Sequence, residues 1–394
     1  MALPCELIDE VLCHVPVKYL LRCRCVSKEW CSLIDSTAFI KKHAKTTIES
    51  NASSGIVITG DQSLFLTDAE SLYADEDVAV TEIKDPLVTV FPGADFVGAS
   101  NSLLCFCKNN WNDFLLYNPS TRKHKKVPSI GEFVLWFDFV LVSHCGFGYD
   151  HVNDDYKIVK IAEFCGMVVM VYSLKSNQWT QIHNVPNNIL IHPLSRKGMF
   201  AHGALHWLAA KNLPGSSYII LGFDLGFERF REIPSPVARN GKFYVADGGS
   251  LCILEECTNS RTDAWLINNY GAENPWYKAL SMEQPGALGS FRVYRPVVSS
   301  RSGKDVLLEV DISKLVWYDP ERKVVKNVRI HGLPSKFGAE LYRESLLQLS
   351  ENEQLQKPSK DKKEKKQQKE RDNKEKKQQT KRDNFLSKGF KLKL

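Results

Sequence analysis

An aromatic residue followed by a turn-forming residue recurs through the middle of the chain at an interval of about 50 residues. The full copies are Tyr117-Asn118, Tyr172-Ser173, Phe223-Asp224 and Tyr318-Asp319. Six residues after the turn residues lie His124, Trp179, Phe230 and Val325, and nine residues after them lie the β-branched Val127, Ile182, Ile233 and Val328. A degenerate copy begins at Trp265, and an earlier copy ends at Asp68. The repeat predicts a modular domain in which each unit packs against the next.

Short β-rich runs lie between turn residues throughout residues 46–350, and helical periodicity is scarce there. About 50 residues per unit, with four short strands each, is the spacing of kelch-type propellers. The spacing therefore predicts an all-β, kelch-like β-propeller of about six irregular blades over residues 46–350. An array of β-sandwiches is the alternative architecture.

Residues 1–45 have a different pattern, with apolar residues at helical spacing. Pro16 separates two of the expected helices, and Ser27 is placed to cap the helix that carries Trp30. We expect a small all-α bundle of three or four short helices. A bundle of this size buries too little apolar surface to be secure alone, so it needs a neighbouring domain or a partner.

Residues 351–394 form a low-complexity tail that contains the duplicated segments KEKKQQKERDN and KEKKQQTKRDN. From Lys357 onward there are 16 basic and 6 acidic side chains, whereas the rest of the chain has 36 basic and 40 acidic ones. Without an apolar seam, the tail is expected to be disordered or a transient, solvated helix. Its basic cluster is a candidate nuclear-import signal, formed by Lys374, Lys376, Lys377, Lys381 and Arg382.

The composition argues against several classes of protein. A basic fold for nucleic acid would carry its charge on the folded body, so we do not expect the body to bind nucleic acid. Nucleic-acid binding is left as an alternative role of the tail alone. No apolar run reaches the roughly 18–20 residues that span a bilayer, so membrane insertion is not expected. The N-terminus lacks the pattern of a signal peptide, and 11 cysteines without framework spacing suit free thiols. We expect an intracellular protein, cytoplasmic and nuclear.

The chain contains no complete catalytic or cofactor motif. Gly146 and Gly148 lack the third glycine of a dinucleotide loop, and His202 and His206 lack the glutamate of the zinc-protease helix. No serine or cysteine lies in a nucleophile elbow. We therefore expect no catalytic residue, no metal and no cofactor. A propeller enzyme with carboxylates on scattered loops stays open as an alternative.

The segment LPCELIDEVLCHVPVKYLLRCRCVSKEWCSLIDSTAF resembles an F-box along about forty residues. An F-box implies docking to a Skp1-like adaptor, which joins a cullin scaffold in a ubiquitin ligase. By this resemblance Val26 and Trp30 hold the bundle together, and His14-Val15 departs from the usual pattern. The implied adaptor-binding residues are Leu3, Pro4, Leu7, Ile8, Val11, Leu12, Pro16 and Leu20.

Residues 114–127, 146–159, 202–207 and 307–319 resemble segments of the F-box-associated domain of plant proteins. Their order is particularly similar to that in plant F-box proteins that restrain defence by lowering immune-receptor levels, and self-incompatibility F-box proteins share the same domains. The resemblance implies a non-catalytic subunit whose propeller recognises a protein substrate for ubiquitination and proteasomal degradation. Aromatic residues in irregular stretches are the candidates for target binding, namely Trp111, Trp136 and Phe137.

Overall fold

The computed structural model describes most of the chain up to residue 349. The described residues are 5–50, 54–60, 63–68, 71–73, 78, 80–83, 90–109, 111–130, 142–164, 166–212, 217–237, 241–245, 250–258, 261–267, 270, 275–283, 294–300 and 302–349. Residues 1–349 form one compact unit. Trp136 and Phe137, the nuclear-import candidates of the tail, and Leu3 and Pro4 lie outside the described residues.

Four helices open the chain, as the pattern in residues 1–45 predicts. They are α1 (Cys5–Cys13), α2 (Val17–Cys23), α3 (Lys28–Ile34) and α4 (Thr37–Ser50). The Ser27 hydroxyl accepts a hydrogen bond from the Trp30 amide at 3.1 Å, so the expected N-cap of α3 is confirmed. None of the helices that the structure describes is long and apolar enough to cross a membrane.

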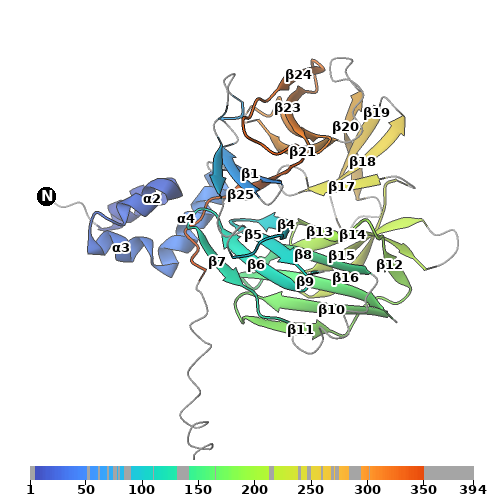
Figure 1. The fold of residues 1–394 in the computed structure, drawn as a ribbon, viewed down its shortest axis with the longest axis horizontal. Coiled ribbons are helices and arrows are strands. Elements are labelled where there is room, and N and C mark those ends of the chain that lie inside the picture. The colour runs from blue at the N-terminus through green and yellow to red at the C-terminus, as the bar shows by residue number, and fades with distance from the viewer. Residues whose placement is uncertain are drawn as a thin grey trace, which may run out of the picture. The chain divides into compact units, whose positions relative to one another are not determined.

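The rest of the unit is built from antiparallel meanders (Figure 1). Four sheets have four strands each. One contains β25 (Gly338–Arg343), β1 (Ser54–Gly60), β2 (Ser63–Asp68) and β3 (Thr81–Ile83) in that order. Another contains β4 (Asp95–Ser100), β5 (Leu103–Lys108), β6 (Asp113–Asn118) and β7 (Lys123–Lys126). The other two contain β17 (Gly241–Val245), β18 (Leu251–Thr258), β19 (Arg261–Ile267) and β20 (Trp276–Glu283), and β21 (Tyr294–Ser299), β22 (Val306–Val310), β23 (Lys314–Asp319) and β24 (Val324–Asn327).

The fifth sheet has nine strands and corrects the prediction of about six separate blades. It joins the meander β8 (Val142–Asp150), β9 (Asp155–Phe164), β10 (Gly166–Ser173) and β11 (Gln178–Ile182) to the meander β13 (Lys197–Ala201), β14 (Ala204–Lys211), β15 (Tyr218–Asp224) and β16 (Arg229–Pro234), while β12 (Ile189–Ile191) pairs with β14. The junction is a short parallel pairing of β13 with β8, in which Lys197 faces Cys145 and Gly198 faces Gly146. The described residues thus form a propeller-like domain with four separate four-stranded blades and one composite sheet. The 50-residue period does not predict this pairing between the edge strands β8 and β13 of neighbouring units.

The sequence repeat corresponds to the outer hairpin of the sheets. Each aromatic anchor is buried at the end of a third strand, and the residue six positions past its turn residue is its cross-strand partner: Tyr117 faces His124, Tyr172 faces Trp179, Phe223 faces Phe230 and Tyr318 faces Val325. The turns share one backbone feature, a left-handed residue at Arg122, Asn177, Glu228 and Lys323. Every full copy of the repeat is therefore one outer hairpin.

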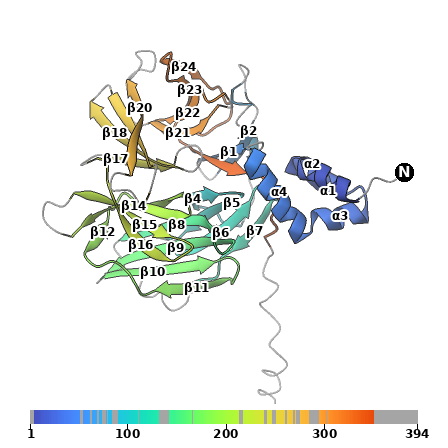
Figure 2. The same cartoon turned by 180° about the vertical axis from the view of Figure 1, so that it is seen from behind.

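The core lies between neighbouring sheets. Trp207 and Leu205 of β14 belong to one apolar cluster with Val159 and Ile161 of β9. Trp317 of β23 shares another cluster with Ile56 and Ile58 of β1. The last strand, β25, pairs with β1 from Ser54 opposite Arg343 to Thr59 opposite Gly338. Figures 1 and 2 show β25 beside β1, so the two ends of the β-rich region close it. This pairing leaves β1 with a partner on both edges.

Candidate functional site

The four helices enclose a small apolar core. Leu12, Val17, Leu20 and Phe39 are buried in it. Leu346, which follows the last strand of the propeller, is also a core member at 2% exposure. The bundle therefore takes part of its core from the propeller end of the chain, which meets the need for a neighbour that the sequence predicts.

Several apolar side chains of the bundle are exposed instead of buried in this core. Leu7 and Val11 lie one turn apart on α1 with 54% and 65% of their surface exposed. Tyr19 on α2 and Val26, just before α3, are 51% and 64% exposed. Large apolar side chains gathered on one small bundle mark a surface for another protein. We call Leu7, Val11, Tyr19 and Val26 the exposed helical face.

The implied adaptor-binding residues divide between this face and the core. Leu7, Val11 and Pro16 are exposed, and Ile8 is half-buried, whereas Leu12 and Leu20 lie inside the bundle at 3% and 0% exposure. The first group is available to a partner. The second group supports the helices from within.

The expected core role of Val26 is wrong, because that side chain points to solvent. Trp30 is half-buried against the core, as expected. Tyr19 and Val26 were not singled out as docking residues from the sequence. His14 is exposed, and its ring lies 3.0 Å from the Glu10 carbonyl, so the departure at His14-Val15 does not disturb α1.

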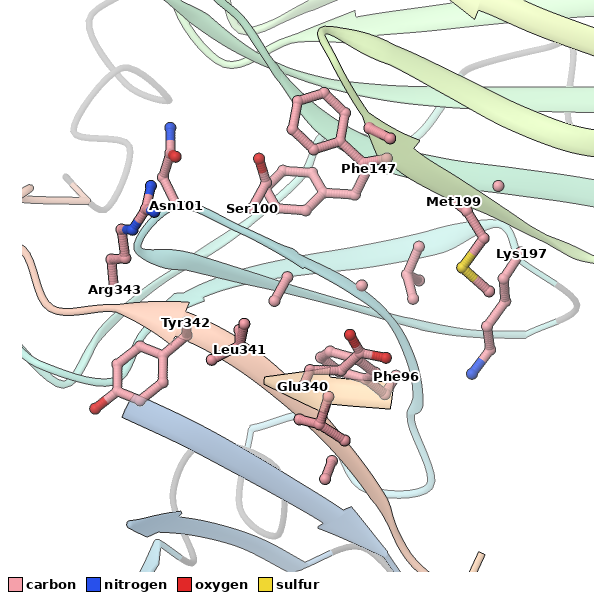
Figure 3. Close-up of a pocket in the computed structure, with 18 of the residues that line it drawn as sticks. Phe96, Ser100, Asn101, Phe147, Lys197, Met199, Glu340, Leu341, Tyr342 and Arg343 are labelled. Atoms are coloured by element: carbon pink, nitrogen blue, oxygen red, sulfur yellow. The ribbon is translucent and has the colours of Figure 1, made fainter. Parts of the chain in front are cut away.

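The second candidate site is a cavity of about 410 Å³ among the first strands of the sheets. Its lining comes from β4, β8, β13, β21 and β25. In Figure 3, Asn101 and Arg343 lie at one end and Lys197 and Met199 at the other. Neither Lys197 nor Arg343 forms an ion pair with any residue that the structure describes. The cavity walls combine aromatic side chains such as Phe96 and Phe147 with charged and polar ones, a mixture that can bind a polar ligand or peptide.

A buried network of charged side chains forms part of one wall of this cavity. The Arg295 guanidinium of β21 donates to Glu309 of β22 at 2.6 Å, to Glu340 of β25 at 2.7 Å and to the Ala339 carbonyl. Glu309 also accepts the Ala339 amide at 2.7 Å. Burial by itself lowers the pKa of Arg295, but Glu340 and Glu309 outweigh it and raise that pKa. The network ties the closing strand β25 to the neighbouring blade.

The histidines near the cavity are structural in character. Burial lowers the pKa of His206 to about 4, against the opposing effect of its contact with the Met199 carbonyl, so the ring is neutral at pH 7. His206 and His202 both lie against the Tyr270 ring, at 5.5 and 5.3 Å between ring centroids. Among the described residues, no three His, Cys, Asp or Glu side chains are grouped so as to hold a metal ion.

Trp111, a predicted target-binding residue, lies in the turn between β5 and β6. Its backbone is left-handed, and its half-buried ring packs on the cluster that contains Cys107, Phe114 and Leu116. The residue thus combines core packing with partial exposure at a loop. Its role in target binding stays a prediction.

Comparison with known proteins now gives both parts a family. Residues 1–42 match the family model of the F-box domain, and residues 95–348 match that of the F-box associated beta propeller domain. The chain belongs to the F-box proteins that carry this propeller domain. The expected resemblance is confirmed in both halves.

Two relatives from Arabidopsis thaliana extend the agreement. The F-box protein CPR1 is 32% identical over 425 residues, covering 100% of this chain and 99% of its own length. The F-box/kelch-repeat protein At3g23880 is 30% identical over 296 residues, covering 71% of this chain and 79% of its own length. Among solved structures, an oligogalacturonate lyase in complex with manganese aligns with a TM-score of 0.38 at 12% identity over 68% of this chain and 71% of its own, a likeness that carries no argument.

As an F-box protein, this chain has an N-terminal bundle that implies binding to a Skp1-like adaptor within an SCF complex. Its relatives indicate a non-catalytic adaptor role. The exposed helical face is the part of the described bundle with the apolar surface that such docking needs.

Proposed function

We propose that this F-box protein is the substrate-recognition subunit of an SCF-type E3 ubiquitin ligase. The exposed helical face carries the proposal: Leu7 and Val11 remain more than half exposed on a bundle that matches the F-box family. Docking of an adaptor would remove these apolar side chains from water. Through the adaptor the chain would join a cullin scaffold.

The mechanism is proximity. The propeller holds a target protein, and the ligase brings its ubiquitin carrier to the same assembly, so a target lysine meets the carrier at a high effective concentration. No covalent step involves this chain. The ubiquitinated target would then be degraded by the proteasome.

Target recognition belongs to the loops and the central cavity of the propeller in this proposal. Half-exposed Trp111 supports a contact on the β5–β6 side. Lys197, which forms no ion pair with the described residues, supports a contact at one end of the cavity. The similarity to defence-restraining plant F-box proteins favours an immune receptor as the target.

The tail bears on where in the cell the protein would act. Its basic cluster at residues 374–382 supports import into the nucleus in addition to a cytoplasmic pool. A role of the tail in nucleic-acid binding, or of the propeller in catalysis, has less support than the F-box match.

The test is adaptor binding by Val11→Asp, measured by biolayer interferometry on the purified full chain with a plant Skp1-like adaptor. An apolar anchor that docking buries contributes about 1–3 kcal/mol, so the variant should bind roughly 5- to 150-fold more weakly. Val324→Asp is the matched control, because Val324 is 56% exposed on β24 and lies in the propeller. It should bind as the wild type does.

Two results would contradict the proposal. Wild-type protein that shows no adaptor binding would remove the ligase role altogether. Equal binding by Val11→Asp and wild type would place the docking surface away from the exposed helical face.

A further inference from the structure

We propose that residues 344–349 form a strap that holds the adaptor-docking helices in one fixed position against the propeller. The strap begins directly after β25 and contacts both parts of the chain. Its consequence for ubiquitin transfer rests on the proposed function: a target bound to the propeller would be presented to the ligase in one geometry.

The strap enters the helical bundle through two side chains. Leu346 is 2% exposed and belongs to the same apolar core as Leu12, Val17 and Leu20. Burial raises the pKa of the Glu344 carboxyl, whereas the nearby Val17 backbone at the start of α2 lowers it, so this carboxyl lies beside the helical bundle. Because the bundle is small, the apolar contact made by Leu346 is a substantial part of its interior.

The strap is also fixed to the propeller by hydrogen bonds. The fully buried Asn118, at the end of β6, donates from its amide nitrogen to the Ser345 carbonyl at 3.1 Å and to the Leu347 carbonyl at 2.8 Å. The Ser345 amide donates to the Ser120 hydroxyl at 3.3 Å. Because the buried Asn118 amide bonds two carbonyls of the strap, the strap has little freedom to move relative to β6.

Apolar packing anchors the far end of the strap. Leu349 is 4% exposed in the cluster that contains Phe114, Leu116 and Phe147, and Leu347 packs against the same cluster. The segment therefore alternates between the two parts: Leu346 faces the helices, while Leu347 and Leu349 face the sheets.

The helical bundle is attached to the propeller at two places, and a single attachment would leave it free to pivot. The first is covalent, because α4 ends at Ser50 and β1 begins at Ser54. The second is the strap, which returns from β25 to the bundle. An exposed ion pair between Lys41 of α4 and Asp154 also joins the two parts, but surface pairs contribute little.

Residues 344–349 would then set the orientation of the exposed helical face relative to the propeller. Ubiquitin transfer depends on how often a target lysine reaches the carrier, so a swinging propeller would lower the effective concentration. In this account Asn118 and Leu346 are positioning residues, since neither lies on the exposed helical face.

The experiment measures the distance distribution between Ser32 on α3 and Lys304 between β21 and β22, both exposed. Spin labels are attached through non-canonical amino acids at these two positions in the full chain, which leaves the native cysteines unchanged. Double electron–electron resonance then compares wild type, Leu346→Ala, Asn118→Ala and the control Leu308→Ala. Leu308 is as buried as Leu346, at 3% exposure, but lies in β22 away from the helices.

Wild type and Leu308→Ala should each give one narrow distance distribution, whereas Leu346→Ala and Asn118→Ala, the two variants that loosen the strap, should each give a distribution at least twice as wide. Asn118→Ala touches no helical residue, so its adaptor affinity should stay within twofold of wild type while its distribution broadens. Unchanged widths in both strap variants would overturn the proposal, as would equal broadening in Leu308→Ala. The distances are measured without adaptor, so failure of the wild type to bind adaptor would refute the proposed function and not the strap.

Discussion

Replacing Arg295 by alanine should destabilise the propeller more than most single substitutions. The Arg295 side chain is 11% exposed and donates to Glu309, at 8% exposure, and to Glu340, at 33%. In the variant, Glu309 keeps only the Ala339 amide among the donors that the structure shows. A buried carboxylate then remains without its cation, which is the costly case for an ion network.

The size of the effect follows from these exposures. Removing one partner of a buried ion pair costs about 3–5 kcal/mol. Glu340 is about one-third exposed, so solvent compensates part of its loss and the lower half of that range applies. We expect about 3–4 kcal/mol, which corresponds to a fall of about 6–10 °C in the melting temperature of a domain of this size.

The assay is urea unfolding followed by circular dichroism, with thermal unfolding as a second measure. Arg322→Ala is the matched control, because the Arg322 side chain is 82% exposed and its ion pair with Asp319 spans 3.8 Å. It should change stability by less than about 0.5 kcal/mol. The double variant Arg295→Ala/Glu309→Gln should recover about 1–2 kcal/mol relative to Arg295→Ala, because the unpaired charge is gone.

A loss of less than about 1 kcal/mol in Arg295→Ala would refute this reasoning. So would a double variant that is less stable than Arg295→Ala, since the two groups would then act independently. Either result would mean that β25 is held by its strand pairing with β1 and not by the ion network.

Two further predictions concern pH and the tail. The folded pKa of His206, about 4, lies below its ordinary value of 6.5, so the neutral ring stabilises the fold above pH 6.5, and this stability is lost as pH falls toward 4. Urea unfolding between these pH values should show a loss of up to about 3 kcal/mol in the free energy of unfolding from this group. His206→Gln should flatten this dependence of stability on pH, while the exposed His183→Gln should not. An equal pH dependence in His206→Gln and wild type would contradict this prediction. Changing Lys374, Lys376, Lys377, Lys381 and Arg382 to Gln should exclude a fluorescent fusion from the nucleus without changing its melting temperature, and nuclear fluorescence that persists would disprove import by the tail.

Much of the fold could be predicted because its signals are local. The aromatic anchors Tyr117, Tyr172 and Tyr318 mark outer hairpins, and each hairpin is decided within about ten residues by strand propensity and turn chemistry. The Ser27 cap is equally local, since its hydroxyl bonds an amide three residues ahead. Local features of this kind are fixed before the chain meets its distant parts.

The candidate sites were less accessible to sequence reasoning. Helical periodicity finds Leu7, Val11, Leu12 and Leu20 as apolar, but it does not say which of them another element will cover. The structure buries Leu12 and Leu20 and leaves Leu7 and Val11 in water. The cavity could not be predicted from the repeat, because its lining comes from strands of different units and the repeat does not distinguish one unit from another.

The sequence by itself therefore determined the short N-terminal helices, the β-hairpin repeat and the F-box resemblance, all of which depend on spacings of a few to about 50 residues. Only the tertiary structure decided the composite sheet, the closure of β1 by β25, the partners of Arg295 and the entry of Leu346 into the helical core. These contacts join residues from distant parts of the chain, and apolar or charged patterning identifies a residue that needs a partner without identifying the partner. Which surfaces meet is set by packing and loop closure over the whole chain, and that is information no local spacing contains.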